Sequence, residues 1–167
     1  MSYIKSQAGT GNQAVVSIAA PGGTPSTATY TQVGEISEFN QSGTVNKTDD
    51  TTNLNSIAEE FIPTILTPGN FSGTMNRVSD DAGQIAVQTA FGGIIGSTPT
   101  PPTLNYWKVQ LAMNPNLATP QTVQGDSLIF LALVEEFSDF GTVKADKAVK
   151  TTLKLKISGA IYRTLGH

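Results

Sequence analysis

The sequence predicts a mainly β fold, a β-sandwich or barrel of about six to seven strands with one flanking α-helix. Three observations lead to this prediction. Charged residues make up 14% of the 167 residues, against about 25% in typical domains. The chain is rich in threonine and carries 16 glycines and 9 prolines, which is typical of strands joined by turns. Apolar residues recur mostly at a spacing of two, and one segment has helical spacing. The length fits a single domain, 1–167.

The first half of the chain contains four predicted strands, preceded by a small, polar segment, 1–12, that we interpret as a mobile N-terminal arm. Pro63 has no N–H for a β-ladder, so its strand is expected at a sheet edge or a bulge. Side chains alternate along a strand, which places Phe71, Gly73 and Met75 on one face. The four strands are Ala14–Ala19, Tyr30–Phe39 with a bulge near Gly34, Glu59–Leu66 and Phe71–Val78.

The segment 41–57 is the least core-like part of the chain. It is polar, rich in threonine and aspartate, and much longer than the roughly 4–6 residues of a typical connection. Loops of this length either carry a function or form unstructured surface. From these residues alone, both interpretations stay open.

A single helix is predicted over Asp80–Phe91, where Ala82, Ile85, Ala86 and Ala90 recur at helical spacing. Ser79 is the expected N-cap, Asp80 and Asp81 complement the helix dipole, and Gly92-Gly93 ends the helix. An extended connector is expected over Ser97–Thr103. The remaining predicted strands are Trp107–Met113, Leu128–Val134 and Val149–Tyr162.

The last two strands have opposite patterns. Leu128–Val134 has no polar alternation, which predicts a strand covered on both faces. Val149–Tyr162 has the cleanest alternation in the chain, with Leu153, Leu155 and Ile157 on one side and lysines on the other.

Composition argues against catalysis. The chain has no cysteine, and its single histidine is the last residue, His167. Thiolate or histidine metal sites and His-based catalysis are therefore excluded. Adjacent carboxylates on a strand point to opposite faces, so they form no catalytic dyad. We predict no enzyme activity and no cofactor.

Charge and hydropathy limit the classes of partner that we expect for the chain. A net charge of -3 argues against a dedicated nucleic-acid-binding domain. The longest apolar run, Leu128–Val134, is far shorter than the roughly 18 residues of a membrane span. The first residues contain no apolar signal segment. We therefore expect neither a membrane span nor secretion, and synthesis in a cytoplasm.

The order of these features resembles a known family. A threonine- and aspartate-rich loop precedes Glu60-Phe61-Ile62-Pro63, and the strand Phe71–Asn76 leads directly into the helix. A Trp-Lys-Val-Gln-Leu strand, 107–111, and a terminal Leu153–Gly159 segment follow. In this order, over about 14–163, the chain resembles the major tail tube proteins of long-tailed, lambda-like, non-contractile bacteriophages.

The resemblance implies a structural role. In that family, six copies form a ring, rings stack into a hollow tube, and DNA passes through the lumen without specific binding. Inner sheets of the six copies join into one barrel, which removes exposed sheet edges. The implied partners are further copies of the chain, a tape-measure protein, a tail terminator and tail-tip proteins. The implied location is the virion tail, after synthesis and assembly in the host bacterial cytoplasm.

The resemblance also implies two sets of functional residues. The N-terminal arm and the long loop would contact neighbouring subunits or rings, and a negatively charged lumen would repel DNA phosphates. Alternating Lys150, Lys154 and Lys156 would oppose such a lumen unless they pair across subunits. The candidate contact residues are Tyr3, Ile4, Thr44, Val45, Lys47, Asp49, Asp50 and Leu54, and the candidate lumen residues are Glu35, Glu38, Glu135, Glu136 and Asp139.

Two alternatives stay open. One is an inner-tube subunit of a contractile tail or of a secretion or injection apparatus, with the same fold and hexamer. The other is a carbohydrate-binding β-sandwich, which would need an exposed aromatic platform. Tyr106 and Trp107 are the adjacent candidates for such a platform.

Overall fold

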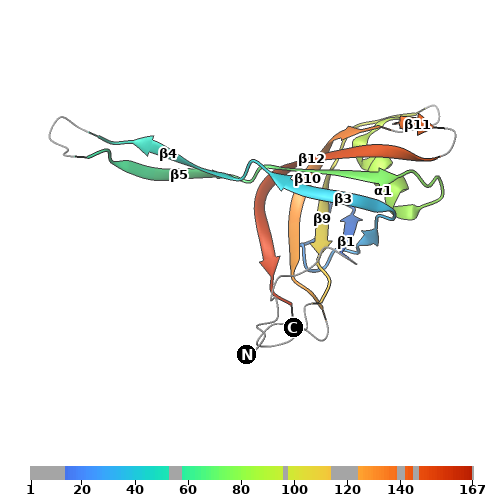
Figure 1. Ribbon diagram of the computed structural model, residues 1–167, viewed down its shortest axis with the longest axis horizontal. Coiled ribbons are helices and arrows are strands. Elements are labelled where there is room, and N and C mark those ends of the chain that lie inside the picture. The colour runs from blue at the N-terminus through green and yellow to red at the C-terminus, as the bar shows by residue number, and fades with distance from the viewer. Residues whose placement is uncertain are drawn as a thin grey trace, which may run out of the picture.

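The computed structural model describes residues 14–52, 58–95, 98–113, 124–138, 142–144 and 147–166. The elements are mostly strands (Figure 1). In chain order they are β1 (Val15–Ala19), β2 (Thr31–Gln32), β3 (Ile36–Ser42), β4 (Val45–Asp50), β5 (Phe61–Thr67), β6 (Asn70–Asn76), α1 (Ala82–Phe91), β7 (Gly93–Ile95), β8 (Thr98–Thr100), β9 (Leu104–Gln110), β10 (Ser127–Phe137), β11 (Thr142–Lys144) and β12 (Lys147–Thr164).

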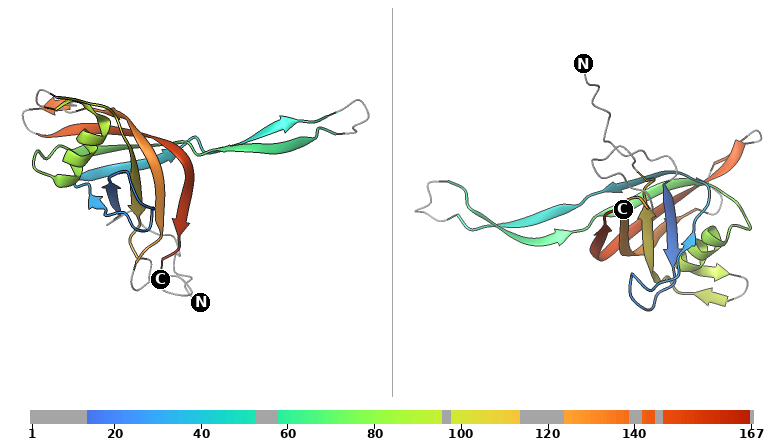
Figure 2. Two further views of the ribbon diagram at one scale, coloured as in Figure 1. Left: turned by 180° about the vertical axis from the view of Figure 1, so that it is seen from behind. Right: turned by 90° about the horizontal axis from the view of Figure 1, so that it is seen from below.

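One curled antiparallel sheet forms the body, with the strand order β2-β1-β9-β10-β12-β6-β3 and β11 paired to β12. The sheet has the shape of a half-barrel, and α1 packs against β10, β1 and β2 on its concave side (Figures 1 and 2). The predicted mainly β fold with a flanking helix is confirmed. None of the described helices is long and apolar enough to cross a membrane.

The core lies between the concave face and α1. Trp107, Phe130 and Leu155 are fully buried there. Phe71 stacks on Phe130 with a centroid distance of 4.5 Å, and Phe39 stacks on Phe71 at 5.0 Å. Such offset aromatic contacts add to the apolar area removed from water. The stack ties β3, β6 and β10 together across the sheet.

The long strands β10 and β12 show how far alternation predicts burial. On β12, Leu153, Leu155 and Ile157 are buried and the residues between them face outward, as predicted. On β10, Phe130, Ala132 and Val134 are buried, but Leu131 and Leu133 on the opposite face are only half-buried. The expectation that β10 is covered on both faces is therefore wrong for the isolated chain.

A bulge in β12 lets the sheet bend. Phe130 pairs with Ile161, whereas the next residue, Leu131, pairs with Ser158, so two residues of β12 are left over. Gly159 lies in this bulge with φ +81, a left-handed conformation that favours glycine. Both strands bend in this region (Figure 1). The bend divides the sheet into a half containing β3 and β6 and a half containing β1 and β9.

The chain itself closes the half-barrel. β2 and β3 are consecutive in sequence but lie at opposite edges of the sheet. The Val33 N–H donates to the Val16 carbonyl at one edge (2.9 Å), and the Asn76 N–H donates to the Glu35 carbonyl at the other (3.0 Å). Residues 33–35 thus cross between the edges. The sequence predicted one strand over Tyr30–Phe39, which is wrong because this crossing interrupts it.

The N-terminus of α1 holds this crossing in place. The buried Gln84 side chain donates to the carbonyls of Gly34 (3.2 Å) and Asn76 (2.8 Å). Its side-chain oxygen accepts from the Val78 N–H (3.0 Å). The Asp81 carboxylate accepts from the N–H groups of Gln84 (2.7 Å) and Gly34 (3.3 Å). One buried amide and one carboxylate therefore join both sheet edges to the helix.

The predicted boundary of α1 is confirmed at its C-terminus and is wrong at its N-terminus. Asp81 is the N-cap, so the prediction of Ser79 as the cap and Asp80 as the first helical residue is wrong by two residues. Both residues can cap a helix, and the contact with Gly34 accounts for Asp81. The helix ends at Phe91 with Gly92 at φ 80, as the Gly92-Gly93 pair predicted.

Two segments that the sequence predicts as irregular each contain one strand of a hairpin. Within 41–57, residues 45–50 form β4, which pairs antiparallel with β5 from Val45↔Thr67 to Asp50↔Phe61. The expectation of a loop there is wrong for these residues. The predicted connector Ser97–Thr103 contains β8, which pairs with β7. Polar or proline-containing strands lack the burial pattern that identifies a strand in a sequence.

We predict that Gly83→Ala lowers the free energy of unfolding by about 3 kcal/mol. An alanine Cβ at this position would overlap the carbonyl oxygen of Gln32 and lie 2.5 Å from the Cα of Val33. The crossing would have to move away from α1. Urea denaturation measures the loss, with Ile85→Ala, an exposed position on the same helix, as a control expected to cost less than about 1 kcal/mol. Equal losses in both variants would contradict the account.

Candidate functional site

The β4–β5 hairpin extends away from the body (Figures 1 and 2). All six residues of β4 are exposed, as are the first six of β5. The exposed fractions of Phe61, Ile62, Ile65 and Leu66 lie between 54% and 70%. An isolated two-stranded ribbon is marginally stable in water. The hairpin therefore carries apolar side chains that no other described part of the chain covers.

The hairpin joins the body at two glycines. Gly43 and Gly69 have φ values of +74 and +81, and a side chain on Gly69 would overlap the Ser42 carbonyl. They lie between the paired strands β3–β6 and β4–β5. Only glycine adopts this backbone without strain. The joint sets the direction in which the hairpin leaves the body.

The distal end of the hairpin is acidic and hydrogen-bonded. The Thr51 N–H donates to the Glu60 carbonyl (2.8 Å), and the Glu60 N–H donates to the Thr52 hydroxyl (2.9 Å). Hydrogen bonds from the Thr52 side chain and backbone lower the pKa of the exposed Asp50 carboxyl. Asp50 therefore stays ionised, and the described distal carboxylates are Asp49, Asp50, Glu59 and Glu60.

The predicted contact residues fall into three groups. Thr44 lies at the base of the hairpin, where it accepts from the Gln41 amide (2.9 Å) and donates to the Pro68 carbonyl (3.1 Å). A second group is exposed on β4: Val45, Lys47, Asp49 and Asp50. The third group lies outside the described residues: Tyr3, Ile4 and Leu54. The roles of all three groups in assembly stay predictions.

Pro63 lies where the sequence placed it. β5 pairs only with β4, so Pro63 is in a strand with a free edge, and Thr48 is its partner across the hairpin. The register shifts between Asn46 and Thr48, directly beside this pair. Both parts of the expectation for Pro63, an edge strand and a bulge, are confirmed.

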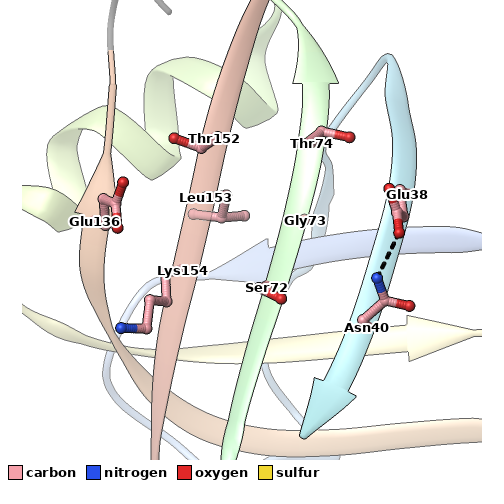
Figure 3. A pocket seen from close by; sticks show the side chains of 9 residues that line it. All are labelled: Glu38, Asn40, Ser72, Gly73, Thr74, Glu136, Thr152, Leu153 and Lys154. Carbon is pink, nitrogen blue, oxygen red and sulfur yellow. Dashed lines mark hydrogen bonds between the residues drawn. The ribbon is translucent and has the colours of Figure 1, made fainter.

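A polar hollow lies on the outer face of β3, β6, β12 and β10, the side of the sheet away from α1 (Figure 3). Its volume is about 300 Å³. Glu38 on β3 and Glu136 on β10 line opposite sides of it, with β6 and β12 between them. Their separation in sequence hides this proximity. The other lining residues include Lys154 and four small polar residues, Asn40, Ser72, Thr74 and Thr152.

Two further candidate lumen residues, Glu135 and Glu35, bond to residues of β12 and β6. Glu135 forms an ion pair with Lys154 at 3.0 Å. Glu35 accepts from the Asn76 side-chain amide at 3.2 Å. Lys154 therefore pairs within the chain, whereas the sequence interpretation required pairing across subunits. Asp139 lies outside the described residues.

A second outer surface, on β9, β10 and the end of β12, is apolar. Antiparallel register places its residues in rows, with Ile129 between Lys108 and Tyr162, Leu131 between Tyr106 and Ser158, and Leu133 between Leu104 and Lys156. Tyr162 is 55% exposed and Leu104 is 40% exposed. We call this surface the outer apolar patch: Leu104, Tyr106, Ile129, Leu131, Leu133 and Tyr162. The sequence analysis did not predict this patch, although the lack of polar alternation in β10 indicated apolar side chains on the outer face.

Tyr106 and Trp107 do not form the aromatic platform that a carbohydrate-binding module would need. Trp107 is fully buried and faces the core, and only Tyr106 of the adjacent pair reaches the outer face. The prediction of a sugar-stacking platform at Tyr106 and Trp107 is therefore wrong.

The half of the sheet that carries the polar hollow has two free edges. β3 ends the strand order on one side. On the other side, β9 pairs with β10 only as far as Leu133, so Val134–Phe137 has no described strand beside it there. Free edges present backbone N–H and carbonyl groups to which another strand can pair.

Among the described residues there is no group of three or more histidine, aspartate or glutamate side chains that could hold a metal ion. The candidate functional features of the described residues are surfaces: the hairpin, the polar hollow, the outer apolar patch and the edges.

The sequence matches no protein-family model and no curated protein. Solved structures share its fold. A chain in the anti-feeding prophage cap, described as a tube terminating cap, has a TM-score of 0.65 at 8% identity, over 99% of this chain and 97% of that chain. A chain in the sheath-tube complex of PVC, an extracellular contractile injection system, has a TM-score of 0.59 at 7% identity, over 91% and 88%.

A third similar chain comes from the tail of an empty gene transfer agent particle with C6 symmetry. Its TM-score is 0.58 at 14% identity, over 94% of this chain and 99% of that chain. The three matches cover between 91% and 99% of the chain. The predicted tail-tube fold is confirmed.

Proposed function

We propose that the chain is a structural, non-catalytic subunit of a tail tube, in which hexameric rings stack into a hollow conduit for DNA. The observation that carries the proposal is the β4–β5 hairpin. Its exposed Phe61, Ile62, Ile65 and Leu66 are too extensive an apolar surface for a free ribbon. A second copy is the partner that a self-assembling tube supplies.

Ring formation would use the free edges. The edge of β3 in one copy would pair with the edge at Val134–Phe137 in the next, as strands add to open sheets in other assemblies. Six such joints would close a barrel without free edges. The C6 symmetry of the gene transfer agent tail supports a hexamer.

The polar hollow would face the lumen. Four carboxylates, Glu35, Glu38, Glu135 and Glu136, lie on or beside this face with three lysines, Lys150, Lys154 and Lys156. The ion pair between Glu135 and Lys154 leaves three carboxylates and two lysines, so the face keeps a small negative excess. Such a wall repels phosphate weakly and lets DNA slide.

Two types of tail are candidates, and they differ in the proteins that bind the tube. The resemblance of the sequence points to a non-contractile, lambda-like tail, in which a tape-measure protein, a terminator and tail-tip proteins complete the virion structure. The likeness to a chain of the PVC sheath-tube complex favours a second candidate, the inner tube of a contractile system. A tube that nucleates a sheath from co-expressed sheath protein would select the second candidate.

We predict that the purified chain at high concentration forms six-fold rings or hollow tubes in electron micrographs, and that the hairpin is required. Ser42 and Asn70 are paired, so residues 43–69 can be replaced by an Asn-Gly turn without disturbing β3 and β6. We expect this variant to keep the thermal midpoint of the body within a few degrees and to form no tubes. Tubes from the variant, or a wild-type chain that stays monomeric with tail partners present, would contradict the proposal.

A second prediction concerns the lumen. Tubes of Glu38→Lys or Glu136→Lys should retain labelled DNA in cosedimentation at low salt and release it as salt increases, because a basic wall binds phosphates. Asp80→Lys, in the turn before α1, makes the same charge change elsewhere. It should behave like wild type, which retains little DNA. Equal retention by all variants would place the hollow outside the lumen.

A further inference from the structure

We propose that the outer apolar patch of one copy binds the β4–β5 hairpin of a second copy, with β5 across the patch and the acidic distal end of the hairpin beside Lys108. This inference rests on the proposed function, because it names the surface that receives the hairpin. It also makes the contact heterologous, so that each copy both gives a hairpin and receives one.

The first argument is complementarity within one chain. The hairpin and the patch are both apolar and uncovered, with Ile65 70% and Tyr162 55% exposed. The hairpin points away from its own body, so it does not cover its own patch (Figures 1 and 2). Two complementary surfaces that do not meet within one chain can bind each other between copies. Because giver and receiver differ, the contact repeats from copy to copy.

The second argument is size. From Phe61 to Leu66, β5 spans roughly 17 Å, and from Ile129 to Leu133 the patch spans roughly 13 Å along β10. Neighbouring strands add Tyr106 and Tyr162 on either side of β10. Two tyrosines flanking aliphatic side chains provide the amphipathic contact area that is common at interfaces.

The third argument is charge. The distal end of the hairpin carries Asp49, Asp50, Glu59 and Glu60, of which Asp50 has a hydrogen-bonded carboxylate. Lys108 and Lys156 lie at the two sides of the patch, and the three rows that form it contain no acidic residue. Opposite charges at the rim of an apolar contact fix its orientation and its partner.

An apolar hollow beside α1 is a poorer receiver. It lies between α1 and the segment from β1 to β2, where Ala19, Ile85 and Thr89 are among its lining residues. No lysine or arginine is among its described lining residues, and Asp81 caps the adjacent end of α1. An acidic hairpin would meet like charge there, which is unfavourable.

Cross-linking tests the contact directly. The chain has no cysteine, so Ile65→Cys on the hairpin and Tyr162→Cys in the patch introduce the only thiols. Mixed single-cysteine variants should form disulfide-linked dimers on oxidation of the assembled sample, well above the yield of either variant alone. Ile85→Cys, 46% exposed in the α1 hollow, replaces Tyr162→Cys as the control for the other receiver and should give only background cross-linking.

A charge exchange gives a second readout. Lys108→Glu should raise the protein concentration needed for assembly at least about tenfold, because it places like charges together. Adding Asp49→Lys and Glu59→Lys should lower that concentration again. Lys150→Glu, outside the patch, should change it little.

The outcomes separate the two proposals. Tubes that cross-link through Ile85→Cys, or that give no Tyr162→Cys cross-link and no charge rescue, overturn this inference and leave the tail-tube proposal standing. A chain that forms no multimers, with tail partners present, overturns both.

Discussion

The buried amide of Gln84 is the interaction on which the rest of the structure depends. It bonds to backbone groups beside both edges of the sheet, while Asp81 caps α1 and holds Gly34. Leaving these buried groups without partners would cost about 1–3 kcal/mol each. With them satisfied, residues 33–35 cross between the edges, the sheet curls around α1, and the aromatic stack of Phe39, Phe71 and Phe130 closes the core.

This closure leaves a well-covered interior and an exterior that carries exposed apolar surface and free strand edges. The concave face is covered by the chain's own helix, whereas the β4–β5 hairpin, the edge of β3 and much of the outer apolar patch are left exposed among the described residues. In the proposed tube, other copies would cover this apolar surface. Stability of the body and the proposed assembly would then be carried by different residues.

Half-buried elements could be predicted from the sequence, because burial on one face leaves a period of two, as on β6 and β12, and Gly92 ends the helix by its own backbone preference. β4 could not, since residues exposed on both faces carry no period. The crossing depends on Gln84, which lies 50 residues from Gly34. The proximity of Glu38 and Glu136 depends on strand order, which no local pattern encodes. The apolar run of β10 did indicate a second covered face, but the chain alone does not supply its cover.

Hydrogen exchange of backbone amides in dilute and assembled samples tests the account most directly. Strong protection of β9, β10 and β12 is expected in both states, with a gain of protection at 45–50, 61–67 and the outer edge of β3 on assembly, because other copies then cover the exposed ribbon and pair with this edge. A hairpin already protected in the dilute monomer, or one that still exchanges freely in the assembled sample, would contradict the account.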